Sequence, residues 1–207
     1  MRKAFVSILL AFGLAATGAG AHGLAAASAN PQSGAPGPKA TEGTRDPRAY
    51  FTDTALLTQD GRTIRFYSEM LKDRVVVVNM MYTSCTEACP LITKRLNEVR
   101  KDLGELFGRK VFFVSISSDP ERDTPRAMKE FAKAQGADVA GWTFLTGNKR
   151  DVDAILKRFG ALSENVESHA TTLYILDVDR KRMRKMMPNL PAKAIAEAAR
   201  IIAAPAS

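Results

Sequence analysis

The feature that most constrains the fold is a run of β-branched and other apolar residues, Val75–Tyr82, followed directly by a segment with helical periodicity. A strand that is covered on both faces has such a run in place of an alternating pattern. A second run, Val111–Ser117, predicts a second buried strand. Between the two runs, apolar residues recur at spacings of four and three, on one face of a helix: Ile92, Leu96, Val99, Leu103 and Leu106. This order of elements indicates an α/β fold.

The rest of the chain continues this alternation of strands and helices. Asp60 and Gly61 lie between two short β-type segments and predict a hairpin at the start of the domain. Asp123 or Thr124 is expected to cap a helix that begins at Pro125 and runs to about Gln135. The other elements that we expect are strand 142–146, helix 149–159 closed by Gly160, strands 171–176 and 182–186, and helix 192–204. Together they predict a sheet with helices on both faces, plus an N-terminal hairpin.

The first 48 residues have a different composition from the rest. Arg2 and Lys3 precede an apolar run that ends in small residues, which is typical of a secretory signal peptide over residues 1–29. An uncleaved N-terminal anchor is the alternative, because the run approaches the length of a membrane-spanning helix. Residues 30–48 are rich in Pro, Gly and Ser and predict a flexible linker. We therefore expect an exported, periplasmic chain with one domain over residues 49–207.

The charge of the chain limits its partners. The formal net charge is +8, and the chain remains basic if Arg2 and Lys3 are removed. Outside the cytoplasm, a basic surface indicates an acidic protein partner or an anionic membrane surface, not nucleic acid. Arg180–Lys185 holds five basic residues in six, with no aromatic residue among them. Such a run is usually a solvated hairpin face, and it is also suited to docking an acidic partner.

Thiol and imidazole chemistry in this chain depends on very few residues, because there are only two Cys and two His. Cys85 and Cys89 lie where the first buried strand ends and its helix begins, and such ends are where α/β sheets bind ligands. Proline is tolerated at the first position of a helix, so Pro90 predicts that Cys89 is the cap residue. The helix N-terminus should then favour the thiolate of Cys89. The two sulfurs are close enough to form a disulfide or to bind one ion together.

Two thiolates are soft ligands that suit a cuprous ion, and they leave room for a third ligand. His169 is the only imidazole in the predicted domain, on the loop before strand 171–176. A structural disulfide and an ordinary surface histidine are the alternatives. A disulfide across so short a loop would stabilise the fold only weakly, because it restricts the unfolded chain little. We therefore expect a functional site with metal ligands Cys85, Cys89 and His169.

The ordered motifs of the domain resemble the Sco/SenC family over most of residues 50–190. They are Tyr82–Pro90 with its C-x-x-x-C-P pair, Val114–Pro125, Trp142–Gly147, and Ser168 with His169. The resemblance implies a thioredoxin-like fold and copper binding by Cys85, Cys89 and His169, as Cu(I) and also as Cu(II). Two positions depart from the family pattern. Thr86 stands where proline often follows the first cysteine, and Ser168 stands where an acidic residue commonly precedes the histidine.

Three functions follow from these observations. The first is a copper chaperone, not an enzyme, that delivers copper to the copper centre of cytochrome c oxidase, as the resemblance implies. Its partners would be a copper-accepting oxidase subunit and a copper donor. The second is a thiol–disulfide oxidoreductase that uses the redox pair Cys85 and Cys89 to reduce cysteines of a copper-site protein. The third is an extracytoplasmic protein with an inert disulfide. The C-x-x-x-C spacing argues against an ordinary thioredoxin-type reductase, which has C-x-x-C.

Three secondary features have plainer interpretations. Asp119–Pro125 predicts turn and helix-cap chemistry in preference to a catalytic carboxylate. Met183, Met186 and Met187 offer soft sulfur, but we expect them to pack in the core or at its rim. His22 would become an N-terminal copper ligand only if signal cleavage follows Ala21.

Overall fold

The structure, a computed structural model, describes residues 46–165 and 171–205. The expected signal segment 1–29 lies outside the described residues, and so does most of the expected linker 30–48. The first described element, α1, begins at Pro47, so the last two residues of that expected linker are helical. No helix within the described ranges has both the length and the apolar character needed to cross a membrane.

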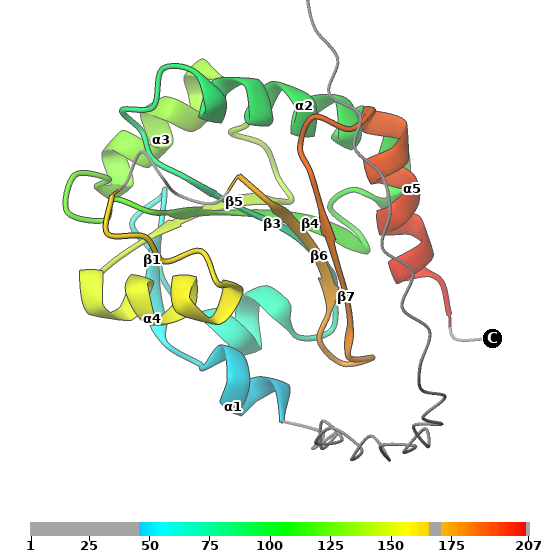
Figure 1. Cartoon of the computed structure of the whole chain (residues 1–207), viewed down its shortest axis with the longest axis horizontal. Coiled ribbons are helices and arrows are strands. Elements are labelled where there is room, and N and C mark those ends of the chain that lie inside the picture. The colour runs from blue at the N-terminus through cyan, green and yellow to red at the C-terminus, as the bar shows by residue number, and fades with distance from the viewer. Residues whose placement is uncertain (1–45, 166–170, 206–207) are drawn as a thin grey trace, which may run out of the picture. The chain divides into compact units, whose positions relative to one another are not determined.

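Strands and helices alternate through the central part of the chain, as the apolar runs predict (Figure 1). In chain order the elements are α1 (Pro47–Phe51), β1 (Ala55–Thr58), β2 (Thr63–Arg65), the π-helical turn η1 (Phe66–Leu71), β3 (Val75–Met81), α2 (Ala88–Leu103), the 3-10 turn η2 (Gly104–Leu106), β4 (Val111–Ser117), α3 (Pro125–Ala134), β5 (Trp142–Thr146), α4 (Lys149–Phe159), β6 (Leu173–Asp177), β7 (Arg182–Met186) and α5 (Ala192–Ala203).

The strands of the described residues form one seven-stranded sheet in the order β2-β1-β5-β4-β3-β6-β7. The three central strands β3, β4 and β5 are parallel, and β6 runs antiparallel to β3. The sheet ends in antiparallel pairs on both sides, β1 with β2 and β6 with β7. Parallel central strands need both faces covered, which explains why their sequences are mostly apolar.

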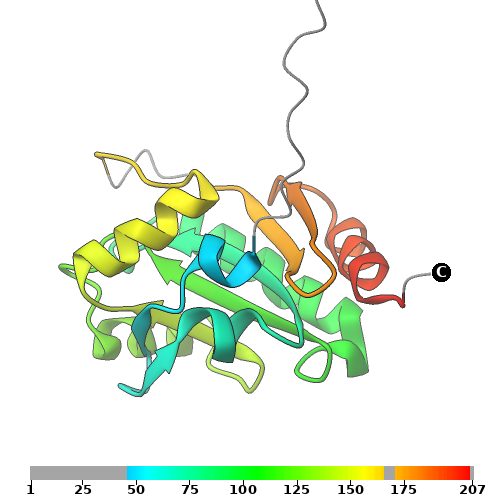
Figure 2. The same ribbon diagram turned by 90° about the horizontal axis from the view of Figure 1, so that it is seen from below.

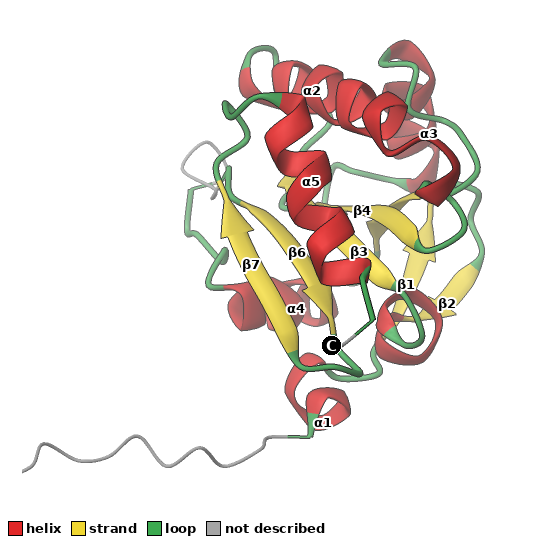
Figure 3. Cartoon of the chain, turned by 90° about the vertical axis from the view of Figure 1, so that its right-hand side faces the viewer, coloured by secondary structure: helices red, strands yellow, loops and turns green. Residues whose placement is uncertain are grey.

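Alternate residues of β3 point into two separate hydrophobic cores. Val75 and Val77 pack with α2, α3 and α5 on one face of the sheet, where Figure 3 shows α5 against α2. Val76 and Val78 pack on the other face with α1, η1 and α4, which Figure 2 shows in front of the sheet. This is the expected sheet with helices on both faces, and the period of two along β3 separates the two cores.

The register places three loops at one end of the sheet. Met81 at the end of β3 pairs with Ser117 at the end of β4, so the loops that follow these parallel strands start side by side. Tyr174 near the start of β6 pairs with Val78, and β6 runs in the opposite direction. The chain that enters β6 therefore comes from the same end of the sheet as the cysteine loop.

A row of buried polar side chains crosses the three parallel strands. The indole Nε1 of Trp142 on β5 donates to Ser115 Oγ on β4 at 2.9 Å, and that hydroxyl donates to Asn79 Oδ1 on β3 at 2.7 Å. All three residues are buried, and these hydrogen bonds satisfy their polar groups inside the sheet.

Most predicted boundaries are confirmed. Thr124 caps α3, and its hydroxyl accepts a hydrogen bond from the backbone N–H of Ala127. Gly160 ends α4 in the left-handed region, with φ of 66°. A few boundaries differ by one or two residues. β6 runs over Leu173–Asp177 instead of 171–176, because pairing with β3 and β7 decides its ends. β3 ends at Met81 and not at Tyr82, and α5 ends one residue early, at Ala203.

Candidate metal centre

The two cysteines lie in the loop between β3 and α2 and in the first turn of α2. The backbone N–H of Cys85 donates to the carbonyl of Tyr82 at 3.2 Å, which closes a tight turn after β3. The backbone N–H of Cys89 donates to the sulfur of Cys85, also at 3.2 Å. The first N–H groups of a helix have no partner within the helix. The Cys85 sulfur therefore accepts one of these hydrogen bonds and caps α2.

This geometry corrects the prediction that Cys89 is the cap residue. The helix begins one residue earlier, at Ala88, with Glu87 in the cap position and Pro90 in the third helical position. Proline fits there because none of the first N–H groups of a helix is bonded within it, so no hydrogen bond is lost. The prediction for Cys89 was wrong because it allowed Pro90 only at the first position of the helix.

The two thiols differ in acidity, and the expected preference is reversed. Burial raises the pKa of Cys85, but hydrogen bonds from the side chain and backbone of Cys89 and from the backbone of Glu87 outweigh it and leave the pKa below its usual value. For Cys89, burial and the hydrogen bond to Cys85 raise the pKa to about 12. The thiolate therefore forms first at Cys85, which is also the more exposed of the two, at 9% against 1%.

Both cysteines belong to the described part of the chain, where they are separate thiols and not a disulfide. A side-chain hydrogen bond between the two thiols puts both sulfurs side by side at the start of α2, and both residues are buried. Such a pair has two soft donors for one ion, but it is not a complete site. Within residues 46–165 and 171–205, no group of three His, Cys, Asp or Glu side chains is placed to hold a metal ion.

Asp123 is a site residue that the sequence did not reveal. Its carboxylate accepts hydrogen bonds from the backbone N–H and the hydroxyl of Thr83, at 3.0 and 2.6 Å, and from Ser117 Oγ at 2.6 Å. The residue is only 1% exposed. It therefore fastens the cysteine loop to the end of β4. In the sequence, Asp123 stands next to the helix cap Thr124, in the loop after β4. The parallel pairing of β3 and β4 brings that loop beside the cysteine loop.

The rest of the segment Asp119–Pro125 follows the predicted turn and cap chemistry. Asp119 bonds to Arg122 at 3.2 Å, and its backbone N–H donates to Ser117 Oγ. Asp123 differs, because burial raises the pKa of its carboxyl more than the bonds from Ser117 and Thr83 lower it. The prediction of turn chemistry was therefore incomplete at this one position.

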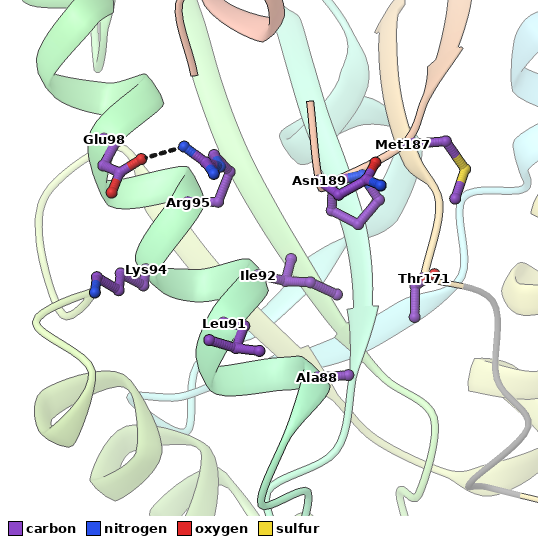
Figure 4. A pocket seen from close by; sticks show the side chains of 10 residues that line it. Ala88, Leu91, Ile92, Lys94, Arg95, Glu98, Thr171, Met187 and Asn189 are labelled. Carbon is purple, nitrogen blue, oxygen red and sulfur yellow. Dashed lines mark hydrogen bonds and ion pairs between the residues drawn. The ribbon is translucent and has the colours of Figure 1, made fainter. Parts of the chain in front are cut away.

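His169 lies outside the described residues, so the structure does not test its predicted role as a ligand. Thr171, which follows two residues later, lines a groove of about 540 Å³ together with Ala88, the neighbour of Cys89. Figure 4 shows Ala88 and Ile92 of α2 on one side of this groove, and Thr171 and Asn189 on the other. The described chain thus resumes beside the helix turn that holds Cys89.

The methionines divide between core and surface. Met186 is buried among residues of α5 and β6, as predicted. Met183 and Met187 are 52% and 53% exposed, so the expected packing fails for these two. Met187 lines the groove beside Ala88, whereas Met183 lies further back on β7.

The comparison with known families decides the relationship of the chain. A family model described as SCO1/SenC matches residues 42–204, which is most of the sequence and all of the sheet. The chain belongs to the SCO1/SenC family. The resemblance that the C-x-x-x-C-P segment and the later motifs carry is thereby confirmed.

Solved structures agree with this membership and with a thioredoxin-like fold. A SCO1/SenC family lipoprotein from Bacillus anthracis is 30% identical, with a TM-score of 0.65 over 74% of this chain and 95% of that one. BsSco, described with a disulfide switch and as a member of the Sco family of cytochrome c oxidase assembly proteins, is 26% identical, with a TM-score of 0.63 over 74% and 92%. ScoI of Bradyrhizobium japonicum, solved with copper bound, shares the fold at 22% identity and a TM-score of 0.59, over 72% and 96%.

Proposed function

We propose that this chain binds copper through Cys85, Cys89 and His169 and delivers it to the copper centre of cytochrome c oxidase, outside the cytoplasm. The observation that carries the proposal is the meeting of two sulfurs at the start of α2, with the Cys85 pKa lowered. Thiolates are the protein ligands that select Cu(I). The family of the chain includes proteins described as copper-bound and as cytochrome c oxidase assembly proteins.

The direction of β6 supports His169 as the third ligand. Since β6 is antiparallel to β3, the residues before Leu173 approach from the end of the sheet where β3 leads into the cysteine loop. The described chain resumes at Thr171, which lines the groove beside Ala88, and we propose that His169, two residues earlier in the sequence, supplies its imidazole from that side. An imidazole there would complete a site of two sulfurs and one nitrogen.

An anaerobic titration with Cu(I) against a competing chelator tests the site. The reduced parent should bind one ion, and Cys85→Ser, Cys89→Ser and His169→Ala should each weaken that binding. Ser84→Ala is the matched control, because Ser84 is an exposed loop residue beside Cys85 that we do not propose as a ligand. If His169→Ala binds copper as tightly as the parent does, the three-ligand site is wrong.

The difference between the two thiols favours a second function, reduction of a disulfide in a copper-site protein. The Cys85 thiolate would attack one sulfur of that disulfide and form a mixed disulfide, and the released thiolate would take up a proton. Cys89 would then lose its proton and attack the Cys85 sulfur, which frees the partner as a dithiol and leaves Cys85–Cys89 oxidised. Each reduced chain would reduce one disulfide.

The two functions give different results in one set of variants. If the chain is a reductase only, Cys85→Ser and Cys89→Ser lose stoichiometric disulfide reduction, and His169→Ala retains both reduction and the parent's copper affinity. If it is a copper carrier, His169→Ala lowers the copper affinity and slows transfer to the copper-binding domain of the oxidase subunit. Loss of copper binding in all three variants would support the carrier.

A further inference from the structure

The edge of the sheet next to the thiol site carries a row of positive charge. β7 is the last strand of the sheet in the described chain, so one of its sides has no neighbouring strand. Edge strands present unpaired backbone N–H and C=O groups and attract further strands. The exposed side chains of β7 and the turn before it include Lys181, Arg184 and Lys185.

Most of the basic side chains along this edge have no carboxylate partner. Arg180 is the exception, because it pairs with Asp177 at 2.9 Å. Arg182 donates to the carbonyl oxygens of Ile202 and Ala204, both at 3.0 Å, and Lys185 lies over the ring of Tyr174.

Within the described residues, Lys181, Arg182, Arg184 and Lys185 have no carboxylate at ion-pair distance. Four positive charges thus remain available along one strand and its turn. A negative partner is the only kind that this row attracts electrostatically.

β7 leads directly into the groove beside the thiols. After Met186 the chain passes through Met187, Pro188 and Asn189, which line the groove together with Ala88, Leu91 and Ile92. Leu91 is 67% exposed and Met187 53% exposed, and the exposed Leu190 follows. Two of the six large apolar side chains exposed in the described chain, Leu91 and Met187, therefore line this one groove. The groove volume is within the range of pockets that hold ligands.

We propose that β7 and this groove together dock an extended acidic segment of the copper-accepting protein, with an apolar side chain of that segment in the groove. This inference rests on the proposed copper function. The row of charge orients the segment along the sheet edge, and Met187 and Leu91 hold its apolar residue next to the turn that carries Cys89. The acceptor's copper ligands are thereby brought to the sulfur pair.

Two other occupants fit the surface less well. A second copy of this chain would place like charges opposite each other, because β7 is basic and the chain as a whole carries a formal charge of +8. An anionic membrane would be attracted by the same charges, but it would cover the groove and the thiols beside it. Copper transfer by ligand exchange needs that surface to be open to a protein.

Charge reversal tests the docking surface directly. The variant is Lys181→Glu with Arg184→Glu, two exposed side chains for which no ion pair, hydrogen bond or ring contact exists within the described residues. The control is Lys133→Glu with Lys157→Glu, which changes the net charge equally on α3 and α4. The probe is a labelled peptide of strand length that alternates Glu and Val and ends in Leu, with Gln replacing Glu in its neutral counterpart.

Fluorescence anisotropy of the acidic peptide should show about tenfold weaker binding to the β7 variant at low salt, and no change for the control. The difference should disappear near 1 M salt, where the screening length falls to about 3 Å. Leu91→Gln should weaken peptide binding at every salt concentration. Equal loss in the β7 and control variants would show that only net charge matters and would overturn the proposal.

Copper measurements separate this inference from the function on which it rests. The β7 variant should bind one Cu(I) with the parent's affinity but transfer it more slowly to the oxidase domain. If no variant or parent binds copper, the proposed function fails, while peptide binding still decides the docking surface. If charge reversal on β7 abolishes binding to phosphatidylglycerol–phosphatidylcholine vesicles and leaves peptide binding unchanged, the surface is a membrane surface and the proposal is wrong.

Discussion

The strongest prediction concerns Asp123, which fastens the cysteine loop to β4. Asp123→Ala removes three hydrogen bonds, two from Thr83 and one from Ser117. A hydrogen bond to a charged group contributes about 1.5–3 kcal/mol, and desolvation of the buried carboxylate offsets part of the total. We therefore expect Asp123→Ala to lower the free energy of unfolding by about 3–4 kcal/mol.

Asp123→Asn is the matched control, because an amide has nearly the same shape. Its oxygen can accept both hydrogen bonds from Thr83, and its nitrogen can donate to Ser117 Oγ, so the loss should be about 1 kcal/mol. Urea unfolding followed by circular dichroism measures both variants. The reasoning fails if the alanine variant loses less than about 1 kcal/mol, or if both variants lose the same amount.

The pH dependence of the stability of the parent and of Asp123→Asn gives an independent check. Because burial raises the Asp123 pKa, the folded chain holds this proton more tightly than the unfolded chain. The stability that the bound proton of Asp123 contributes is therefore complete below the usual carboxyl pKa and is lost as the pH rises through the raised folded value, whereas the three hydrogen bonds to its oxygens are a separate contribution. The side chain in Asp123→Asn is neutral at every pH. The stability of that variant relative to the parent should increase from about pH 4 upward. A constant or opposite trend would contradict the raised pKa.

Three further predictions concern single residues. Iodoacetamide should modify Cys85 before Cys89 in the reduced, copper-free chain near neutral pH, since the Cys85 pKa is lowered; fragment masses locate the label, and equal rates would refute the difference. Thr124→Ala should lower the free energy of unfolding by about 1 kcal/mol through loss of the α3 cap, with Thr124→Ser restoring most of it in the same urea assay. Gly160→Ala should cost about 1 kcal/mol because φ is 66°, and Gly160→Asn less; equal costs would contradict a backbone origin.

The sequence was sufficient where structure depends on neighbouring residues. The apolar run of β3, the cap at Thr124 and the stop at Gly160 have local physical causes, and the structure contains each of them. The short α1 and the π-helical η1 were not predicted, because neither has a long apolar period.

The site was predicted less completely than the fold, because its details depend on contacts between distant segments. Cys85 and Cys89 were identified from their spacing, but which sulfur is the more acidic depends on burial and on hydrogen bonds around the two thiols that no pattern shows. Thr83 and Asp123 are forty residues apart, and only the parallel pairing of β3 and β4 brings them together. His169 as a copper ligand stays a prediction.

The buried row through Trp142, Ser115 and Asn79 has a practical consequence, because Trp142 is the only tryptophan of the chain. Through Phe113, the backbone of Trp142 lies level with Val77 on β3, and its indole Nε1 reaches Ser115, which is level with Asn79. From Asn79 to the last residue of that strand is about 7 Å, and Cys85 lies further on. Intrinsic emission of the protein therefore reports whether the three central strands are intact. Emission that stays blue-shifted while copper is added would mean an intact sheet, not an empty site.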